Sequence, residues 1–125
     1  MSADAISWVF EATVKPGSMN EYVSMALDIS KSCEMEEPGQ EIFEWFANDH
    51  DVQIYERYSN SATALFHVER FVANFATHFL SLCTPTRMSV YGAPSNDLKA
   101  ALTGFNPRYY AQFAGYVRDR GAWPH

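Results

Sequence analysis

The chain contains 125 residues, of which 47% are hydrophobic, and its nine basic and fifteen acidic side chains give a net charge of -6. A chain of this length folds as one domain that buries roughly 65% of the surface exposed by its unfolded form. The acidic balance argues against binding to nucleic acid or to anionic membranes, and no run approaches the roughly 20 apolar residues of a membrane-spanning helix.

The amino terminus and the cysteines indicate a cytoplasmic protein. The start of the chain lacks the basic residues and the apolar core of a signal peptide. Cys33 and Cys83 form no CxxC motif, so we expect two reduced, packed thiols and no disulfide. The nine phenylalanines, seven tyrosines and three tryptophans are more than one small core absorbs, so we expect some of them to form a homodimer contact.

The first predicted elements are a strand over residues 6–14 and a helix that begins at Met19. Large apolar residues alternate along the strand, and in the helix they recur every three or four positions. Ser18 and Glu21 have the spacing of a capping box at the start of the helix, and residues 36–39 end it because they contain Pro-Gly. The predicted inner face of the helix contains Tyr22, Ala26, Ile29 and Cys33.

Residues 41–47 and 52–59 form two further predicted strands, joined by a polar four-residue loop that is typical of a hairpin. If Ala47 pairs with Val52, then Phe43 lies opposite Glu56. Glu56 is then the one carboxylate on a face that is otherwise apolar or aromatic. That face contains Phe43, Trp45, Val52, Ile54, Glu56 and Tyr58, and the other contains Ile42, Glu44, Phe46, Gln53, Tyr55 and Arg57.

The second half of the chain continues the alternation of helices and strands. A helix is predicted over residues 62–82, with Ser61 as its cap and a broad apolar stripe. A strand over residues 84–91 and a short helix over residues 96–102 follow. The segment 106–117 is aromatic, and we expect it to be extended and packed on the sheet.

This order of elements predicts the fold class. Strand, helix, strand, strand, helix, strand is the ferredoxin-like α+β pattern, in which helices cover one face of an antiparallel sheet. The other face would expose Ile42, Phe46 and Tyr55, so two protomers that place these faces together would cover them. Tyr55 and Arg57 are residue types enriched in such contacts.

Four short motifs occur in an informative order: Lys15-Pro16-Gly17, Glu37-Pro38-Gly39, Tyr55-Glu56-Arg57-Tyr58, and Ala64 with His67. Together they resemble the antibiotic biosynthesis monooxygenase-like family over about residues 6–91. Each motif is weak alone, but their order and separations are fairly specific. The carboxyl-terminal extension, about residues 92–125, resembles that of one branch of the family.

The resemblance implies a dimeric α+β barrel in which each protomer keeps a pocket between its sheet and its helices. Several members oxidise aromatic polyketides without metal or flavin, whereas others degrade haem, isomerise small phosphorylated sugars or have no assigned activity. Haem-degrading members have a tryptophan at the position of His67 and an asparagine near Phe10, and neither is present here. The resemblance therefore implies the fold more strongly than the reaction, and no cofactor is expected.

Glu56 and His67 are the predicted catalytic residues. If the second helix packs across the Glu56 face, the carboxylate can orient the imidazole as a base that deprotonates a phenol or enol for reaction with oxygen. The alternative is that the two groups only satisfy each other's polarity. A metal site that adds His78 is disfavoured, because continuous helix would separate the histidines by roughly 16 Å. Only a helix break would bring them together.

An aromatic cluster predicts a pocket for a planar ligand, although core packing is the alternative for each member. Its members are Trp45, Phe43, Phe71, Trp8 and Tyr91. The acidic run Glu34, Glu36 and Glu37 is predicted to be a solvated helix end. The sequence thus predicts a cofactor-independent monooxygenase for a small planar, mostly apolar, aromatic or polyketide-like substrate. The alternative is a non-catalytic binding or sensing protein of the same fold.

Overall fold

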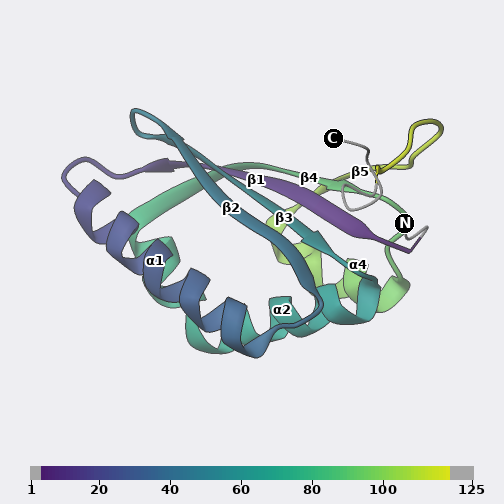
Figure 1. Cartoon of the computed structure of the whole chain (residues 1–125). Coiled ribbons are helices and arrows are strands. Elements are labelled where there is room, and N and C mark those ends of the chain that lie inside the picture. The colour runs from purple at the N-terminus through teal and green to yellow at the C-terminus, as the bar shows by residue number, and fades with distance from the viewer. Residues whose placement is uncertain (1–3, 119–125) are drawn as a thin grey trace, which may run out of the picture.

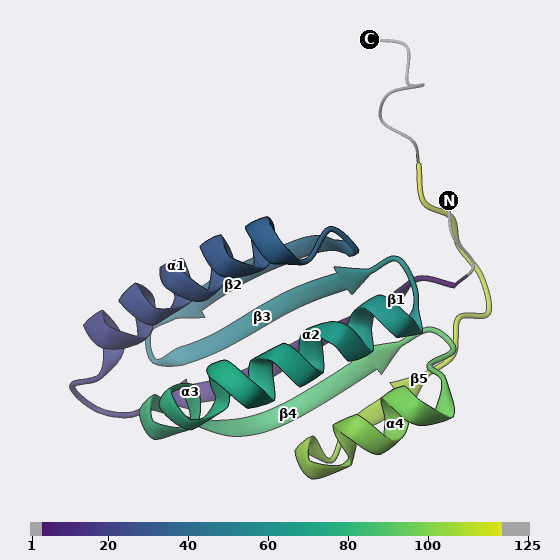
Figure 2. The same cartoon turned by 90° about the horizontal axis from the view of Figure 1, so that it is seen from below.

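The computed structural model describes residues 4–118, which form a curved sheet with helices on one face only (Figure 1). Figure 2 shows α1 running beside the α2–α3 pair across the sheet, with α4 next to β4 and β5. The elements in chain order are β1 (Ile6–Val14), α1 (Met19–Glu36), β2 (Gln40–Asn48), β3 (Asp51–Tyr58), α2 (Ser61–Asn74), α3 (Ala76–Leu82), β4 (Cys83–Tyr91), α4 (Asn96–Leu102), the 3-10 helix η1 (Thr103–Phe105) and β5 (Arg108–Tyr110).

The strand order confirms the ferredoxin-like α+β class. The sheet runs β2-β3-β1-β4-β5, and its first four strands are antiparallel. β5 pairs with β4 in the parallel direction, so the carboxyl-terminal extension adds one parallel strand to the predicted antiparallel sheet and makes it mixed. The extra strand forms because α4 and η1 carry the chain back along the sheet before β5 begins (Figure 2).

The predicted register of the hairpin is confirmed. Phe43 pairs with Glu56, as predicted, and Ala47 pairs with Val52. The connection is shorter than predicted because Asn48 and Asp51 also pair, which leaves a two-residue loop. Asp49 in that loop has a positive φ of 59°, a conformation that aspartate tolerates better than most residues.

The predicted helix starts need correction. Ser18 occupies the cap position of α1, but its side chain makes no capping hydrogen bond, so the predicted capping box is wrong. α2 is capped by Asn60 and not by Ser61: the Asn60 side chain accepts from the Thr63 N–H at 2.9 Å, and the Thr63 hydroxyl faces the Asn60 N–H in return. The reciprocal pair satisfies backbone donors that a helix start leaves unpaired.

The second predicted helix is broken. Phe75, with φ -125° and ψ -25°, separates α2 from α3. The break turns α3 so that Phe79 and Leu82 are buried in the core. The local apolar pattern predicted one continuous helix with a single stripe along it. Tertiary packing has overridden that pattern, because α3 takes a different direction from α2.

The core lies between the sheet and the helices. The predicted inner faces are confirmed: alternate residues of β1 from Ile6 to Val14 are buried, and so are Tyr22, Ala26, Ile29 and Cys33 of α1. Both cysteines are buried and free. None of the helices in residues 4–118 is long and apolar enough to cross a membrane.

The carboxyl-terminal segment packs on the sheet less than predicted. β5 pairs along the edge of β4, and Tyr110 stacks on Tyr91 with ring centroids 5.7 Å apart. Residues 111–118 are exposed, and Phe113 is fully so. The prediction is therefore correct for β5 alone.

Candidate functional site

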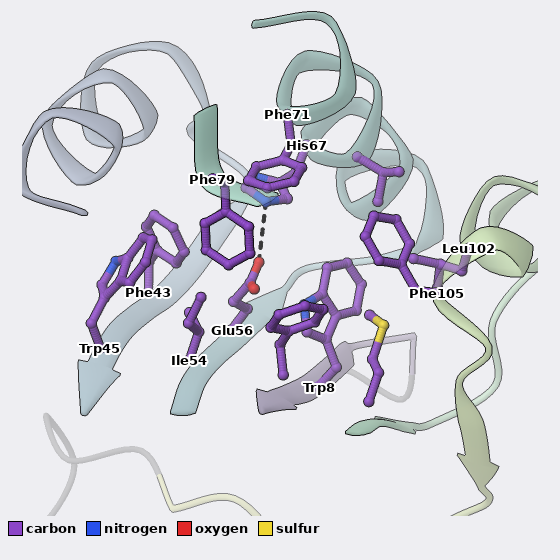
Figure 3. A pocket seen from close by; sticks show the side chains of 13 residues that line it. Trp8, Phe43, Trp45, Ile54, Glu56, His67, Phe71, Phe79, Leu102 and Phe105 are labelled. Carbon is purple, nitrogen blue, oxygen red and sulfur yellow. Dashed lines mark ion pairs between the residues drawn. The ribbon is translucent and has the colours of Figure 1, made fainter. Parts of the chain in front are cut away.

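A small cavity lies between the sheet and α2 (Figure 3). Its volume is about 40 Å³. All but two of its 13 lining residues are apolar or aromatic, and the two exceptions are Glu56 and His67. At 10–15 Å³ per water, such a space holds roughly three waters. A larger guest therefore requires some of the lining side chains to move.

Glu56 and His67 meet at this cavity. Glu56 lies on the buried face of β3, between Ile54 and Tyr58, because alternate residues of a strand share a face. His67 lies on the buried stripe of α2 with Ala64 and Val68. Oε1 of Glu56 is 3.1 Å from Nε2 of His67, and both residues are about 95% buried, with exposed fractions of 5% and 4%. The predicted pair is therefore in contact.

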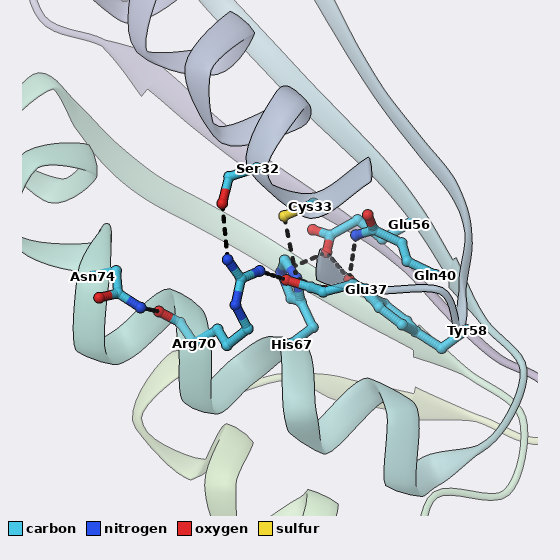
Figure 4. Close-up of polar contacts among 9 residues, drawn as sticks. All are labelled: Ser32, Cys33, Glu37, Gln40, Glu56, Tyr58, His67, Arg70 and Asn74. Atoms are coloured by element: carbon cyan, nitrogen blue, oxygen red, sulfur yellow. Dashed lines mark hydrogen bonds and ion pairs between the residues drawn. The ribbon is translucent and has the colours of Figure 1, made fainter. Parts of the chain in front are cut away.

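A second carboxylate binds the opposite side of the His67 ring (Figure 4). Oε1 of Glu37 is 2.8 Å from Nδ1 of His67, and Glu37 is only 4% exposed. The Arg70 guanidinium pairs with the other carboxylate oxygen of Glu37 and donates to the Ser32 hydroxyl at 2.8 Å. The imidazole is thus held between two buried carboxylates, one of which is anchored by a guanidinium.

A tyrosine and a glutamine extend this network. The Tyr58 hydroxyl donates to Oε1 of Glu56 at 2.6 Å, and the Gln40 side-chain amide donates to the Tyr58 oxygen at 2.8 Å. Oε1 of Glu56 therefore accepts from both Tyr58 and His67. Such donors fix the orientation of a carboxylate that would otherwise lose its hydration on burial.

The charge of His67 follows from these contacts. Burial alone would lower the pKa of His67, but the adjacent Glu56 carboxylate and hydrogen bonds with Cys33, Glu37 and Glu56 raise it well above its ordinary value. For Glu37, burial would raise the pKa, yet the contacts with His67 and Arg70 hold it below its ordinary value. At neutral pH the site contains an imidazolium whose two N–H groups donate to two carboxylates.

Four of the five aromatic residues in the predicted cluster lie at the cavity. Trp8, Phe43, Trp45 and Phe71 line it. Phe43 and Phe71 lie against the His67 ring, with centroid distances of 5.7 and 6.1 Å. The placement of Tyr91 in the pocket is wrong. Its neighbour Val90 is the residue of β4 that points into the core opposite Trp8, so Tyr91 faces the other side of the sheet.

A metal site with His78 is not formed. The helix breaks at Phe75, but His78 lies near the surface, where its Nε2 is 2.7 Å from Glu21. Within residues 4–118, the side chains of Cys33, Glu37 and His67 do place one donor atom each within 4.8 Å of one another. They do not fit a cation, because the Arg70 guanidinium occupies Glu37 and the Cys33 thiol is kept protonated by burial, which raises its pKa.

Sequence reasoning missed the role of Glu37. It was predicted to be a solvated helix end, yet it is buried. The signal was available: Glu37 follows Cys33 by four residues and so lies at the end of the inner stripe of α1, where its N–H donates to the Cys33 carbonyl at 2.9 Å. Arg70 has a similar relation to His67, three residues later on α2. Leu102 and Phe105 also line the cavity. They come from the carboxyl-terminal extension, and no sequence motif indicated that they would lie there.

Solved structures with the same fold are numerous, although the sequence itself matches no protein-family model and no curated protein sequence. MupZ from Pseudomonas fluorescens superposes with a TM-score of 0.83 over 91% of this chain and 94% of its own, at 16% identity. SnoaB from Streptomyces nogalater, a cofactor-independent oxygenase solved as a point mutant, gives 0.55 over 74% and 96%, at 15% identity.

A third neighbour, from Caulobacter crescentus CB15, is provisionally named an antibiotic biosynthesis monooxygenase. It superposes with a TM-score of 0.64 over 74% of this chain and 92% of its own, at 17% identity. The fold is therefore that of the antibiotic biosynthesis monooxygenase-like proteins, as the sequence motifs predicted. Identities this low show a common fold and leave the substrate open.

Proposed function

We propose that this chain is a cofactor-independent monooxygenase that acts on a small planar, mostly apolar substrate of aromatic or polyketide-like character. The observation that carries the proposal is the buried ion pair of Glu56 and His67 at the wall of an otherwise apolar cavity. The aromatic lining favours a planar ring once its side chains move to admit one, and the ion pair supplies the one polar contact that acid–base chemistry needs. The shared fold with a cofactor-independent oxygenase supports the same function.

The contacts of His67 favour a reversal of the predicted roles. Both of its ring nitrogens face carboxylates, and its pKa is raised, so the imidazolium has no free nitrogen to act as a base. Glu56 is the better base. When it takes a proton from an acidic phenol, enol or activated methylene, its negative charge passes to the substrate. The imidazolium then remains beside the new anion as its counterion, so the net charge of the cavity does not change.

Dioxygen is the co-substrate of the next step. The substrate anion transfers one electron to dioxygen, and the resulting radical pair joins to form a carbon–oxygen bond. The peroxide takes up the proton held by Glu56, and the O–O bond then breaks with loss of water. In balance, one methylene group and one molecule of dioxygen give one carbonyl group and one molecule of water. One oxygen atom enters the product, the other leaves in water, and Glu56 is restored as a carboxylate.

Oxygen consumption tests this function directly. The purified chain is mixed with a panel of hydroxylated aromatic compounds and activated cyclic ketones, and uptake is followed with an oxygen electrode. A true substrate consumes one molecule of dioxygen per product and incorporates one labelled oxygen atom when the gas is isotopically enriched. Uptake that survives in Glu56→Gln for every active compound would sink the proposed mechanism.

The small size of the cavity favours a second candidate, a non-catalytic binding or sensing protein. A space of about 40 Å³ suits a closed state that opens only around its ligand. A protein of this kind would quench tryptophan fluorescence with members of the same panel and consume no oxygen. The two readouts together therefore separate the candidates.

We also propose that the open face of the sheet forms a homodimer. No helix of residues 4–118 covers this face (Figure 1), and Phe46 on it is 55% exposed. The half-buried Tyr55 and the Arg57–Glu41 ion pair, at 2.9 Å, lie on the same two strands. An apolar centre with a charged rim is typical of protomer contacts. Sedimentation of Phe46→Glu, compared with the unmodified chain, tests this: a dimer would become a monomer.

A further inference from the structure

Trp45 separates the inner cavity from a second, larger hollow. It lines the cavity that holds Glu56, and it also lines a groove of about 240 Å³ between α1 and β2. The groove is lined mainly by apolar residues of α1 and β2, with Tyr22 opposite Trp45. The two rings meet edge to face, with centroids 5.8 Å apart and an interplanar angle of 73°. The indole is half-buried and forms the wall shared by the two spaces.

Both residues of this wall carry an unsatisfied buried donor. The Trp45 Nε1 and the Tyr22 hydroxyl expose almost no surface, and neither has a hydrogen-bond partner among residues 4–118. Tyr22 is only 3% exposed. Burial, followed by the proximity of Cys83, raises the pKa of Tyr22 well above its ordinary value, so the hydroxyl keeps its proton. Figure 3 shows the indole nitrogen on the side of Trp45 that points away from Glu56.

Unsatisfied buried donors are rare in native proteins, and each weakens the fold unless something else compensates. Two of them on rings in direct contact are a poor use of core positions. A phenylalanine at position 22 would fill the same space without the penalty. The arrangement makes physical sense if the missing acceptor arrives with a ligand.

We propose that Trp45 and Tyr22 form an oxygen-binding subsite that receives a carbonyl or quinone oxygen of the ligand. This inference rests on the proposed function only in placing the ligand in the same pocket. A carbonyl oxygen has two lone pairs, so it can accept from both donors. The ligand then has two polar positions: an acidic hydrogen at Glu56 and a carbonyl oxygen at the far end, joined by a flat apolar frame.

The volumes agree with this two-ended ligand. The inner cavity and the groove are each smaller than the roughly 300–1,000 Å³ of common ligand sites. When the Trp45 indole swings aside, the two spaces join and approach the lower end of that range. In this proposal, movement of Trp45 admits the ligand and frees its indole N–H to donate to the ligand oxygen.

A matched pair of probes tests the subsite. 1-Tetralone and tetralin have the same bicyclic frame, and only the first carries a carbonyl oxygen. Affinities are measured by calorimetry in the Glu56→Gln background, which blocks turnover. With Tyr22 and Trp45 intact, we expect the protein to bind 1-tetralone about five- to tenfold more tightly than tetralin. This difference is the equivalent of one buried hydrogen bond. In Tyr22→Phe and in Trp45→Phe this preference falls toward one.

Tyr22→Phe also has a stability readout. Because it removes an unsatisfied hydroxyl, the ligand-free variant should melt at the same temperature as its parent or higher. Tyr55→Phe is the control, since it makes the same deletion on the other face of the sheet and should leave the preference intact. If Tyr22→Phe lowers the melting temperature and retains the preference, a bound water already satisfies the hydroxyl, and the subsite is refuted.

The two proposals fail separately. If the protein with Tyr22 and Trp45 intact binds 1-tetralone and tetralin equally well, the subsite is refuted. This holds whether or not the chain consumes oxygen. Loss of the preference in Trp45→Phe supports the subsite even if Tyr22→Phe fails to fold. A clear preference for 1-tetralone, with no oxygen uptake by the chain that retains Glu56, would support the subsite and refute the monooxygenase proposal.

Discussion

The two ends of the proposed pocket differ in whether their buried polar groups have hydrogen-bond partners. Where α2 meets β3, the His67 imidazolium lies between Glu37 and Glu56, and each group has a partner. Where β2 meets α1, the donors of Trp45 and Tyr22 have no partner within residues 4–118. A satisfied network holds its geometry in the absence of ligand, whereas an unsatisfied pair gains its partner only on binding. In our proposals the first end carries out the chemistry and the second recognises the ligand.

The largest effect is expected from the loss of the base. Glu56→Gln keeps the size and hydrogen-bonding capacity of the side chain but cannot accept a proton. Oxygen uptake should fall by about 10²–10⁴-fold, the usual contribution of a positioned base. Ligand binding, followed by tryptophan quenching, should persist. A variant with full oxygen uptake would assign the chemistry to another group.

The next largest effect is on stability. His67→Gln leaves Glu37 and Glu56 buried beside a neutral amide, so the free energy of unfolding should drop by about 3–5 kcal/mol in urea titrations. This substitution is therefore a poor test of catalysis. Replacing Glu37, Glu56 and His67 together by glutamine removes all three charges and should recover part of the loss. If the triple variant is no more stable than His67→Gln, buried charge is not the cause.

The pH dependence should reveal the role of Glu37. The folded pKa of His67 is raised, so the stability contributed by the imidazolium is complete below the unfolded pKa and is lost as pH rises through the folded value. The folded pKa of Glu37 is lowered, so its contribution is lost as pH falls through that value. Oxygen uptake should decline on the alkaline side.

Glu37→Gln removes one of the charges that hold the proton on His67, so the alkaline decline should move to lower pH while activity at the optimum is largely kept. An unchanged pH profile of oxygen uptake would show that Glu37 has only a structural role. Arg57→Gln, which alters an ion pair on the opposite face of the sheet, is the matched control.

The smallest effects are expected when one tyrosine hydroxyl is removed at each end of the pocket. Tyr58→Phe removes a donor to Glu56, and the free energy of unfolding should fall by about 1–3 kcal/mol. Tyr22→Phe removes a hydroxyl without a partner, so the free energy of unfolding should stay constant or rise by about 1 kcal/mol. Urea denaturation of the two variants in parallel gives the sign of each change. Equal losses would mean that both hydroxyls are satisfied in solution.

The predictions that depend on local periodicity succeeded. Alternation along β3 placed Glu56 on the buried face, and the pairing of Ala47 with Val52 put Phe43 opposite it. These features follow from a repeat of two residues, which the amino-acid order contains directly. The contact of Glu56 with His67 also followed, because the second helix had one apolar stripe with which to cover that face.

Apart from the placement of Tyr91, the errors concern contacts between distant segments or the exact ends of elements. The break at Phe75 and the cap at Asn60 depend on how the helices settle against the sheet. Tyr91 was placed in the pocket for its chemistry, although its position in β4 turns it to the other face.

The amino-acid order by itself determined the strands, the helical stripes and the solitary carboxylate of an apolar face, because each depends on neighbours a few residues apart. Only the tertiary structure decided that Glu37 completes a triad with His67 and that Trp45 and Tyr22 lack acceptors. Those properties depend on the angle at which α1 crosses the sheet and on which buried atoms come within hydrogen-bonding distance. No local repeat in the sequence encodes either one.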